Sequence, residues 1–514
     1  MNDFDRHHTH AWLILVTVSL SAMSVLSHSI GMISLLLPRM MSEFAIDVQS
    51  AQWVLTSFML TMVVIMPAVG WIGDVFGQRN LYLGSLLLFT GCTFACTLAW
   101  NYPSLIFLRV IQGIAAGCFF PLTTPFIFDS FPEGRRGFVL GASNLTLITG
   151  STLGSLIAST LADSFGWRWG FYYTLVLCTS ALTIGYVLLR DPPRSPVGRF
   201  DFLGAVTLGT AIVSAVLLVT QQNVPLGLNT RTLTLVTLCT VSAVTFIFVE
   251  LRSKSPLVDL GIYRHTTFAA GSFLGFIVPA TTTAVTLLLP IFLQRLLGYS
   301  ILQSAILRVP SGITTAVIGP LTGWLSDRVD PRILIGTGVI GFACMLYALS
   351  SLSMQSSGPS IAGLLVLMGI VSMCIWSPLS NTMFSALPPA SVRLGAGLHA
   401  LMRQLGRSVG GALVAVMFSQ RLSARVARLI GGVSASSAVF SYHLDRLSTR
   451  MLSYPHPDPE SLAIDFIQQT LWQEATVAAF SDCYRITAVI FLITIIPVYF
   501  LRRTAPSCAQ SQAA

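Results

Sequence analysis

The sequence predicts an all-α integral membrane protein, built as two six-helix bundles with pseudo-two-fold symmetry plus two inserted helices. Hydrophobic residues make up 54% of the chain and charged residues only 10%, whereas soluble domains carry roughly 25% charged residues. Fourteen uncharged or nearly uncharged runs are each long enough to cross about 30 Å of hydrocarbon as a helix. One motif also occurs twice, from Pro67 and again 253 residues later from Pro320, which indicates two related halves.

The expected transmembrane helices follow one another along the whole chain. The first run is much longer than the apolar core of a cleaved signal peptide, so we expect it to be retained as a membrane anchor. The fourteen runs lie at about 11–37, 51–73, 80–99, 103–128, 138–161, 169–189, 202–221, 231–250, 268–293, 302–325, 332–353, 361–384, 396–419 and 479–501.

The basic residues of the chain are distributed unevenly between the two expected sides of the membrane. With the N-terminus inside, the inner loops and tails hold fifteen Lys and Arg residues, and the short outer loops hold four. Because basic residues favour the cytoplasmic side, both termini are expected to be cytoplasmic. The net charge of +9 therefore reflects membrane orientation, and no nucleic-acid partner is expected.

The chain divides into three parts in this prediction. Residues 1–200 form the N-terminal six-helix bundle, 201–255 the two inserted helices, and 256–514 the C-terminal bundle with an outer segment at 420–478. That segment is the only sizeable soluble piece, and its apolar spacing predicts a short amphipathic cap. The sequence has no metal-ligand cluster, nucleophilic triad or phosphate loop, so an enzyme is not expected.

The repeated motif is a candidate gate at the inner face. Glycines allow a tight turn between antiparallel helices, an aspartate at a helix end can accept backbone donors, and an arginine can pair with a carboxylate. Asp129, at the end of the fourth run, is the candidate partner, and a plain topological turn is the alternative interpretation. The candidate gate residues are Gly70, Asp74, Gly77, Arg79, Asp129, Asp327 and Arg332.

Several cations fall inside the predicted helices. Arg109, with Gln112 one turn later, lies about a third of the way along the fourth run, where a charge normally faces a cavity or a partner. Snorkelling to the nearer membrane face is the alternative for Arg109. In the thirteenth run, Arg403 and Arg407 share one helical face after His399.

Carboxylates show the opposite distribution, because only Asp482 of the twenty acidic residues falls inside a run. The sequence therefore favours a neutral, zwitterionic or anionic substrate facing Arg109 and Arg403. A proton could be carried by Asp482, His28, His399 or the end carboxylate Asp129. His28 fits a hydrogen-bonded packing role equally well.

With these residues laid out, the chain resembles, over nearly its whole length, the fourteen-span drug:proton antiporters of the major facilitator superfamily, the EmrB/QacA type. The resemblance implies two six-helix bundles around a central cavity, alternating access and proton-driven export from a bacterial inner membrane. The segments that carry it are 70–79, 105–117, 167–171, 201–204, 256–260, 293–300 with Pro310, and 403–406.

The sequence also departs from the family pattern. Ser29 and Ser34 stand in the first-run stretch that typically holds an aspartate and an asparagine, and Asp330 replaces the glycine equivalent to Gly77. Ser151 follows Gly150 where the antiporter motif of the fifth run usually has proline. These departures weaken the expectation of cationic drugs and of strict proton antiport.

The sequence therefore predicts a secondary active transporter, a proton-coupled exporter of a small organic molecule such as a drug-like compound, metabolite or siderophore. An importer or uniporter of a neutral or anionic solute on the same fold is the alternative, and a membrane sensor or enzyme is a remote one. No cofactor is expected beyond the proton gradient as driving force. The expected partners are the substrate and the lipid bilayer, with a periplasmic adaptor protein unproven and a monomer favoured.

Overall fold

The computed structural model is helical throughout the part of the chain that it describes. Eleven of its helices are long and apolar enough to cross a membrane, and Trp12–Val25 is a shorter apolar helix. The predicted all-α membrane fold is therefore confirmed. The described residues are 3–26, 31–123, 126, 150, 152–189, 200–219, 230–253, 258, 260–326, 328–432 and 459–501.

The N-terminal half begins with a long helix and a shorter one that lie on either side of residues 27–30. Asp47 starts the next helix, because its carboxylate accepts a hydrogen bond of 2.9 Å from the backbone N–H of Ser50, a standard N-cap. The helices are α1 (Asp3–Leu26), α2 (Ile33–Glu43), α3 (Val48–Ile65), α4 (Val69–Phe76), α5 (Gln78–Thr97), α6 (Tyr102–Phe119), a helix over 152–165, and α9 (Arg168–Leu188).

The remaining helices comprise the two insertions and the C-terminal half. Ser300 and Gln303 form a capping box at the start of a short helix after the π-helical turn Phe292–Leu296, which satisfies its first backbone donors. The helices are α10 (Phe202–Val219), α11 (Thr230–Arg252), α12 (Thr266–Ile291), α13 (Ile301–Ile306), α14 (Val309–Ser326), α15 (Pro331–Leu349), α16 (Gly358–Ser385), α17 (Pro389–Gly432), α19 (Pro459–Leu492) and α20 (Ile495–Tyr499).

Equivalent helix pairs hold each half together. In the N-terminal half α3 packs against α6, and in the C-terminal half α12 packs against α17. Gly113 lies against the carbonyl of Phe58 in the first pair, and Gly406 against the carbonyl of Phe276 in the second. Because no side chain larger than hydrogen fits there, glycine lets the backbones approach closely.

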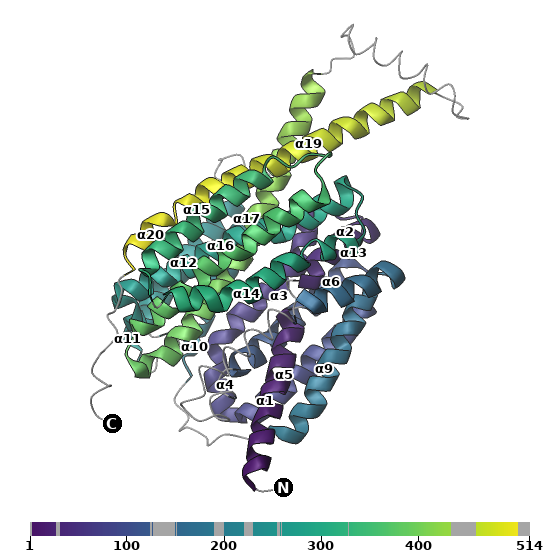
Figure 1. Ribbon diagram of the computed structural model, residues 1–514. Coiled ribbons are helices and arrows are strands. Elements are labelled where there is room, and N and C mark those ends of the chain that lie inside the picture. Colours follow the sequence, from purple (N-terminus) through teal and green to yellow (C-terminus); the bar gives the residue numbers. More distant parts are fainter. Residues whose placement is uncertain are drawn as a thin grey trace.

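The two halves meet along α3 and α17, and the inserted helix α10 packs against both. Leu60 and Val63 of α3 share one apolar cluster with Leu401 of α17 and Val216 of α10. We call the end of the molecule at which α2 ends and α3 begins the outer face, and the end with the α4–α5 turn the inner face. Figure 1 shows the N-terminal helices (purple to blue) and the C-terminal helices (green to yellow) as neighbouring groups.

Helices α17 and α19 extend well past the outer face. Their 44 and 34 residues correspond to about 66 and 51 Å, more than the roughly 30 Å of hydrocarbon. Figure 1 shows both projecting from the bundle. Within the outer segment 420–478, the structure shows α17 continuing past its apolar run and α19 beginning before its own. Residues 433–458, on which part of the predicted amphipathic cap falls, lie outside the described residues. Residues 420–432 contain no proline, so nothing ends α17 where its apolar run stops.

Candidate functional site

Arg109 lies inside the N-terminal half and is completely buried. Its Nε donates to the carbonyl of Val54 at 2.9 Å, and its Nη1 donates to Oε1 of Gln112 at 2.6 Å. The guanidinium also stacks on Phe58, 4.3 Å from the ring centroid. Its Nη2 has no hydrogen-bond partner within the described residues.

Gln112 connects Arg109 to a third helix. Its Nε2 donates to Oγ1 of Thr93 on α5 at 2.7 Å, and Thr93 in turn donates to the carbonyl of Phe89. The chain of bonds from α3 through α6 to α5 holds the Arg109 guanidinium in one orientation. The structure thus brings together Arg109 and Gln112, two of the predicted pathway residues.

A second group of polar residues lies on α17 in the C-terminal half. The Arg403 guanidinium lies 4.7 Å from the ring centroid of Trp376. His399 is 4% exposed, it packs edge-on against Trp376 and Phe384, and neither ring nitrogen has a partner in the described part of the chain. Arg407, one helical turn after Arg403, donates from Nη1 to Oε1 of Gln404.

Arg308 reaches from the C-terminal half to the N-terminal half. It follows α13, and its Nη1 donates to Oγ of Ser34 on α2 over 3.4 Å. Ser34 is completely buried and is one of the two serines where the family resemblance implied an asparagine or aspartate. Sequence reasoning assigned Arg308 no role, because its contact joins residues 274 positions apart.

The motif arginines have equivalent positions in the two halves. Arg79, in the first turn of α5, donates to the carbonyl of Leu189 at 2.6 Å and to that of Tyr186 at 2.8 Å. Arg332, in the first turn of α15, donates to the carbonyl of Leu501 and lies 5.6 Å from the ring centroid of Tyr499. Each arginine thereby satisfies carbonyls at the C-terminus of the last helix of its own half, where a cation also complements the helix dipole.

The turns before these arginines differ. Gly77 has φ 88°, a conformation that glycine adopts at little cost and other residues rarely adopt. Asp330, at the equivalent position, has φ −57° and accepts a hydrogen bond from the backbone N–H of Arg332 at 2.9 Å. The second copy therefore starts its helix with an N-cap aspartate followed by Pro331, instead of a glycine turn.

The other predicted site residues lie apart from these groups. Gly70 and the half-buried Asp74 are on α4. Asp482, on α19, accepts both guanidinium branches of Arg425 at 2.8–3.0 Å, which ties together the two helices that extend from the outer face. His28, Asp129 and Asp327 fall outside the described residues, so the roles proposed for them stay predictions.

Polar contacts join the two halves at the outer face. Nε2 of Gln294 donates to the carbonyl of Leu35 at 2.8 Å, and Arg295 contacts Oγ of Ser42 at 3.5 Å. Asp163 accepts the backbone N–H of Ile301, the first residue of α13, at 3.3 Å. We call these three contacts, with the Arg308–Ser34 contact, the outer closure. Sequence reasoning missed Asp163 and Gln294, because their partners are backbone groups on the opposite half.

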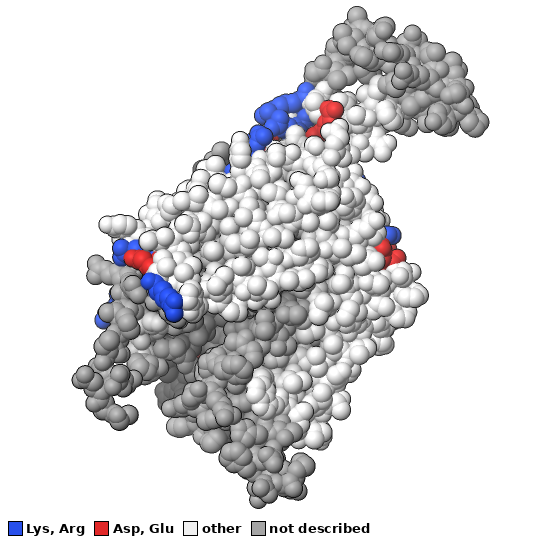
Figure 2. All heavy atoms as spheres, viewed as in Figure 1, with Lys and Arg blue, Asp and Glu red and all other residues white. Residues whose placement is uncertain are grey.

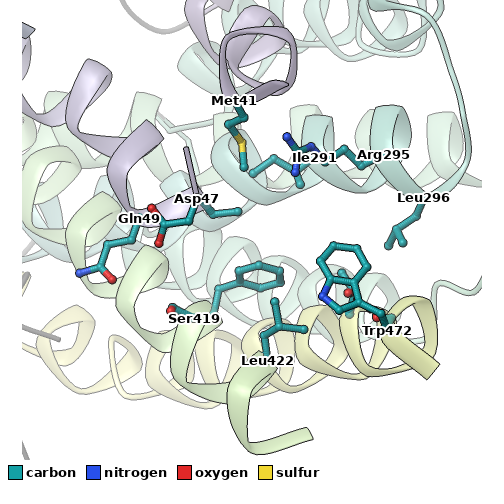
Figure 3. Close-up of a pocket in the computed structure, with 12 residues that line it drawn as sticks. Met41, Asp47, Gln49, Ile291, Arg295, Leu296, Ser419, Leu422 and Trp472 are labelled. Carbon is teal, nitrogen blue, oxygen red and sulfur yellow. Dashed lines mark hydrogen bonds between the residues drawn. The ribbon is translucent and has the colours of Figure 1, made fainter. Parts of the chain in front are cut away.

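A small cavity lies beside the outer closure, between the two halves and the base of α19. It encloses about 130 Å³. Figure 3 shows Asp47 and Met41 of the N-terminal half lining it together with Arg295, Leu422 and Trp472 of the C-terminal half. Because its walls come from both halves, the cavity exists only while the outer face is closed.

The described charges are concentrated away from the apolar flanks. Figure 2 shows Lys, Arg, Asp and Glu near the edges of the molecule and a broad white surface between them. The ion pairs formed between described residues are Arg39–Asp163, Arg168–Glu43 and Arg425–Asp482, and all three lie at or beyond the outer face. This distribution fits a protein whose flanks face lipid.

The fold and this arrangement define a class of protein: a multi-pass membrane transporter of two related halves joined by polar contacts at one face. The chain belongs to the Major Facilitator Superfamily, whose family profile matches residues 18–411. It is a secondary transporter of this superfamily and not an enzyme.

Its relatives include export proteins of similar length. The chain is 24% identical over 498 residues to the multidrug export protein EmrB of Escherichia coli (strain K12), covering 96% of both chains. It is 26% identical over 407 residues to the multidrug resistance protein B homolog of Mycobacterium tuberculosis (strain ATCC 25618 / H37Rv), covering 78% of this chain and 75% of that protein.

Solved structures share the fold. An inward-facing, unoccupied bacterial homolog of the human lysosomal transporter Spinster superposes with a TM-score of 0.65 at 15% identity, covering 98% of this chain and 99% of that one. An auto-inhibited POT family peptide transporter gives a TM-score of 0.62 at 14% identity, covering 97% and 98%. At these identities the likeness concerns the fold alone.

Proposed function

We propose that this chain is a proton-coupled exporter of a small organic molecule, working by alternating access in a bacterial inner membrane with both termini in the cytoplasm. The observation that carries the proposal is an asymmetry between the two faces in the contacts that join described residues. At the inner face, Arg79 and Arg332 each bind the last helix of their own half. At the outer face, Gln294 and Asp163 join one half to the other.

This asymmetry suits a rocking movement. Arg79 fastens the start of α5 to the end of α9, and Arg332 fastens the start of α15 to the end of α20, so each half moves as one body. The outer closure consists of a few hydrogen bonds whose groups can be solvated when they separate, and each net bond is worth only about 0.5–1.5 kcal/mol. Opening the outer face is therefore accessible at ordinary temperature.

Export is favoured over import by the relatives. EmrB of Escherichia coli, named a multidrug export protein, aligns with 96% of this chain. In the proposal, residues 1–200 and 256–514 are the two moving halves, and 201–255 supplies helices that flank the contact between α3 and α17. A proton moving inward would drive the substrate outward.

The test begins with the substrate. Small molecules in the medium of cells that carry the gene would be compared with those of cells that lack it, and compounds depleted from the deletion medium would be purified. Each compound would then be presented to inside-out vesicles with an acidic lumen. We expect accumulation in the lumen that collapses when the proton gradient is dissipated.

The sign of the gradient separates the alternatives. An importer that moves substrate together with protons would accumulate the compound only when the proton gradient is reversed. A uniporter would equilibrate it regardless of the gradient. Either result would overturn the proposed direction or coupling while leaving the fold and family untouched.

A further inference from the structure

We propose that the substrate is an organic anion, bound between the two halves by Arg308 and Arg407 with Arg403 one turn closer to the inner face. This inference rests on the proposed function, because it names the chemical class that the transporter moves. Three observations carry it: where these arginines lie, how few hydrogen bonds they make, and that none of them forms an ion pair with a described carboxylate.

Arg407 lies at the contact between the halves. On the same face of α17, Gln404 contacts Sδ of Met62 on α3 at 3.3 Å, and Gly411 packs against Gln52 of α3. Because residues three and four positions apart share one side of a helix, Arg407 is directed toward the N-terminal half. Arg403 follows the same helix toward the inner face and stacks on Trp376.

Arg308 approaches from the other edge of the same interface. Gly312, four residues on in α14, lies directly against Thr152 of the N-terminal half, and Arg308 itself touches Ser34. The guanidinium of Arg308 therefore lies against the hydroxyl of Ser34, which belongs to the first predicted transmembrane run. A cationic substrate approaching this position would meet a positive charge.

These guanidinium groups have unused donors. An arginine carries five N–H donors, yet in the described part of the chain Arg308 makes one hydrogen bond, Arg407 makes one, and Arg403 makes none. All three side chains are half-buried, so their free donors remain accessible to a ligand. The spare donors have the fork geometry that binds carboxylates, sulfonates and phosphates through two parallel bonds.

The positive charge is also uncompensated. The ion pairs between described residues all lie at or beyond the outer face, and none involves Arg308, Arg403 or Arg407. Charges within the membrane normally pair with one another or face a water-filled path. An anionic ligand supplies the missing charge, and the ring of Trp376 beside Arg403 favours an anion attached to an aromatic or other apolar body.

Binding to purified protein in detergent tests the inference directly. The probes are naphthalenesulfonate, the uncharged naphthalenesulfonamide and trimethylnaphthylammonium, which share one ring system and differ in charge. A ligand of the folded state raises the melting temperature according to its concentration and Kd. We expect naphthalenesulfonate to raise Tm, and the sulfonamide and the ammonium compound to have little effect at equal ionic strength.

Variants locate the site. Arg407→Gln and Arg308→Gln should each weaken binding of naphthalenesulfonate by about tenfold or more, as expected for losing a charge-assisted hydrogen bond. Arg407→Lys keeps the charge and should retain part of the binding, which guards against a variant that merely folds poorly. The matched control is Arg428→Gln, an exposed arginine farther along α17, which should bind like the unchanged protein.

The inference fails if the ammonium probe stabilises the protein and the sulfonate does not, if no probe stabilises it, or if Arg308→Gln and Arg407→Gln bind the sulfonate unchanged. These outcomes are separate from failure of the proposed function, because the binding assay uses no proton gradient. Anion binding without gradient-driven movement would overturn the proton coupling alone. Gradient-driven export of a cation would overturn the anion assignment alone.

Discussion

At the scale of single residues, the same arginine chemistry serves two purposes. Arg79 and Arg332 bind backbone carbonyls at helix ends, a task for which the guanidinium fork and helix dipole suffice. Arg109, Arg308 and Arg407 are embedded in the helical part, and each keeps donors that no described group uses. In our proposals, Arg79 and Arg332 hold each half together as a rigid body, and Arg109, Arg308 and Arg407 serve transport.

Arg109→Ala should reduce transport by at least about tenfold, because it removes charge-assisted hydrogen bonds of about 1.5–3 kcal/mol. Arg109→Lys should lose most transport as well, since an ammonium cannot reproduce the bonds to Val54 and Gln112 together with stacking on Phe58. Initial rates in vesicles with equal amounts of monodisperse protein are the measurement. Arg485→Ala, which loses an arginine bound to Ser350 at the outer end of α15, is the control and should transport normally.

Full activity of Arg109→Ala would show that this arginine has no part in transport. Equal loss in Arg485→Ala would show that the loss of transport is not specific to the Arg109 position.

The two motif turns should respond differently to substitution. Gly77→Ala places a side chain at φ 88° and should cost about 1–3 kcal/mol of stability. Asp330→Ala loses an N-cap and should cost about 1 kcal/mol, whereas Asp330→Gly should cost only a few tenths. Melting temperatures in detergent, measured in parallel, check this order.

A Gly77→Ala variant with an unchanged melting temperature would contradict the explanation by backbone strain. An Asp330→Gly variant as unstable as Asp330→Ala would contradict the capping explanation.

At the scale of helices, the close approach of backbones at glycines decides which helices pair more than hydrophobicity does. The uncharged apolar runs located each described membrane helix, but α17 continues for many residues after its run ends and α19 begins many residues before its run starts. Backbone hydrogen bonding continues until a residue breaks it, and the Arg425–Asp482 pair joins the two extensions. Likewise, the pairing of α12 with α17 depends on Gly406 and Phe276, which lie 130 residues apart in the sequence.

Two glycines on α17 provide a matched comparison. A methyl group at Gly406 would collide with the carbonyl of Phe276, whereas one at Gly397 would meet open space. Gly406→Ala should destabilise the protein by about 1–3 kcal/mol through overpacking. Gly397→Ala should be neutral or stabilising by up to about 1 kcal/mol, because alanine favours helix.

Thermal unfolding followed by circular dichroism distinguishes the two variants, and transport should fall only in Gly406→Ala. Equal melting temperatures would mean that α12 can move away from α17 at little cost, contrary to the close packing described above.

At the scale of the whole molecule, the outer closure is the contact that, in our proposal, sets which face is open. Asp163 accepts the first backbone donor of α13 from the opposite half, and a carboxylate at a helix N-terminus is favoured by the dipole. Arg39 contacts the same carboxylate at 3.8 Å, but its side chain is 60% exposed. Such an exposed pair is worth little, so the contact between the halves is the one that controls opening.

Asp163→Ala should therefore increase the outward-open population by about fivefold or more, corresponding to loss of about 1 kcal/mol of contact between the halves. Electron–electron resonance between spin labels at Ser164 and Ser360, both exposed near the outer face, would report it in a background without native cysteines. Arg39→Ala is the matched control and should leave the distance distribution nearly unchanged. A shift in Arg39→Ala equal to that in Asp163→Ala would assign the closure to the ion pair instead.

The sequence by itself determined the membrane class, the order of the described helices and the repeat, because apolar length, charge asymmetry and motif spacing are properties of contiguous residues. It also identified Arg109, Arg403 and Arg407 as unusual, because a charge inside an apolar run is visible without a structure. The tertiary structure alone decided what they face. Arg308 contacts Ser34, Asp163 contacts Ile301, and Arg332 contacts Leu501. Each contact joins helices that are distant in the sequence. Two of the three acceptors or donors are backbone groups, which the identity of a residue does not reveal.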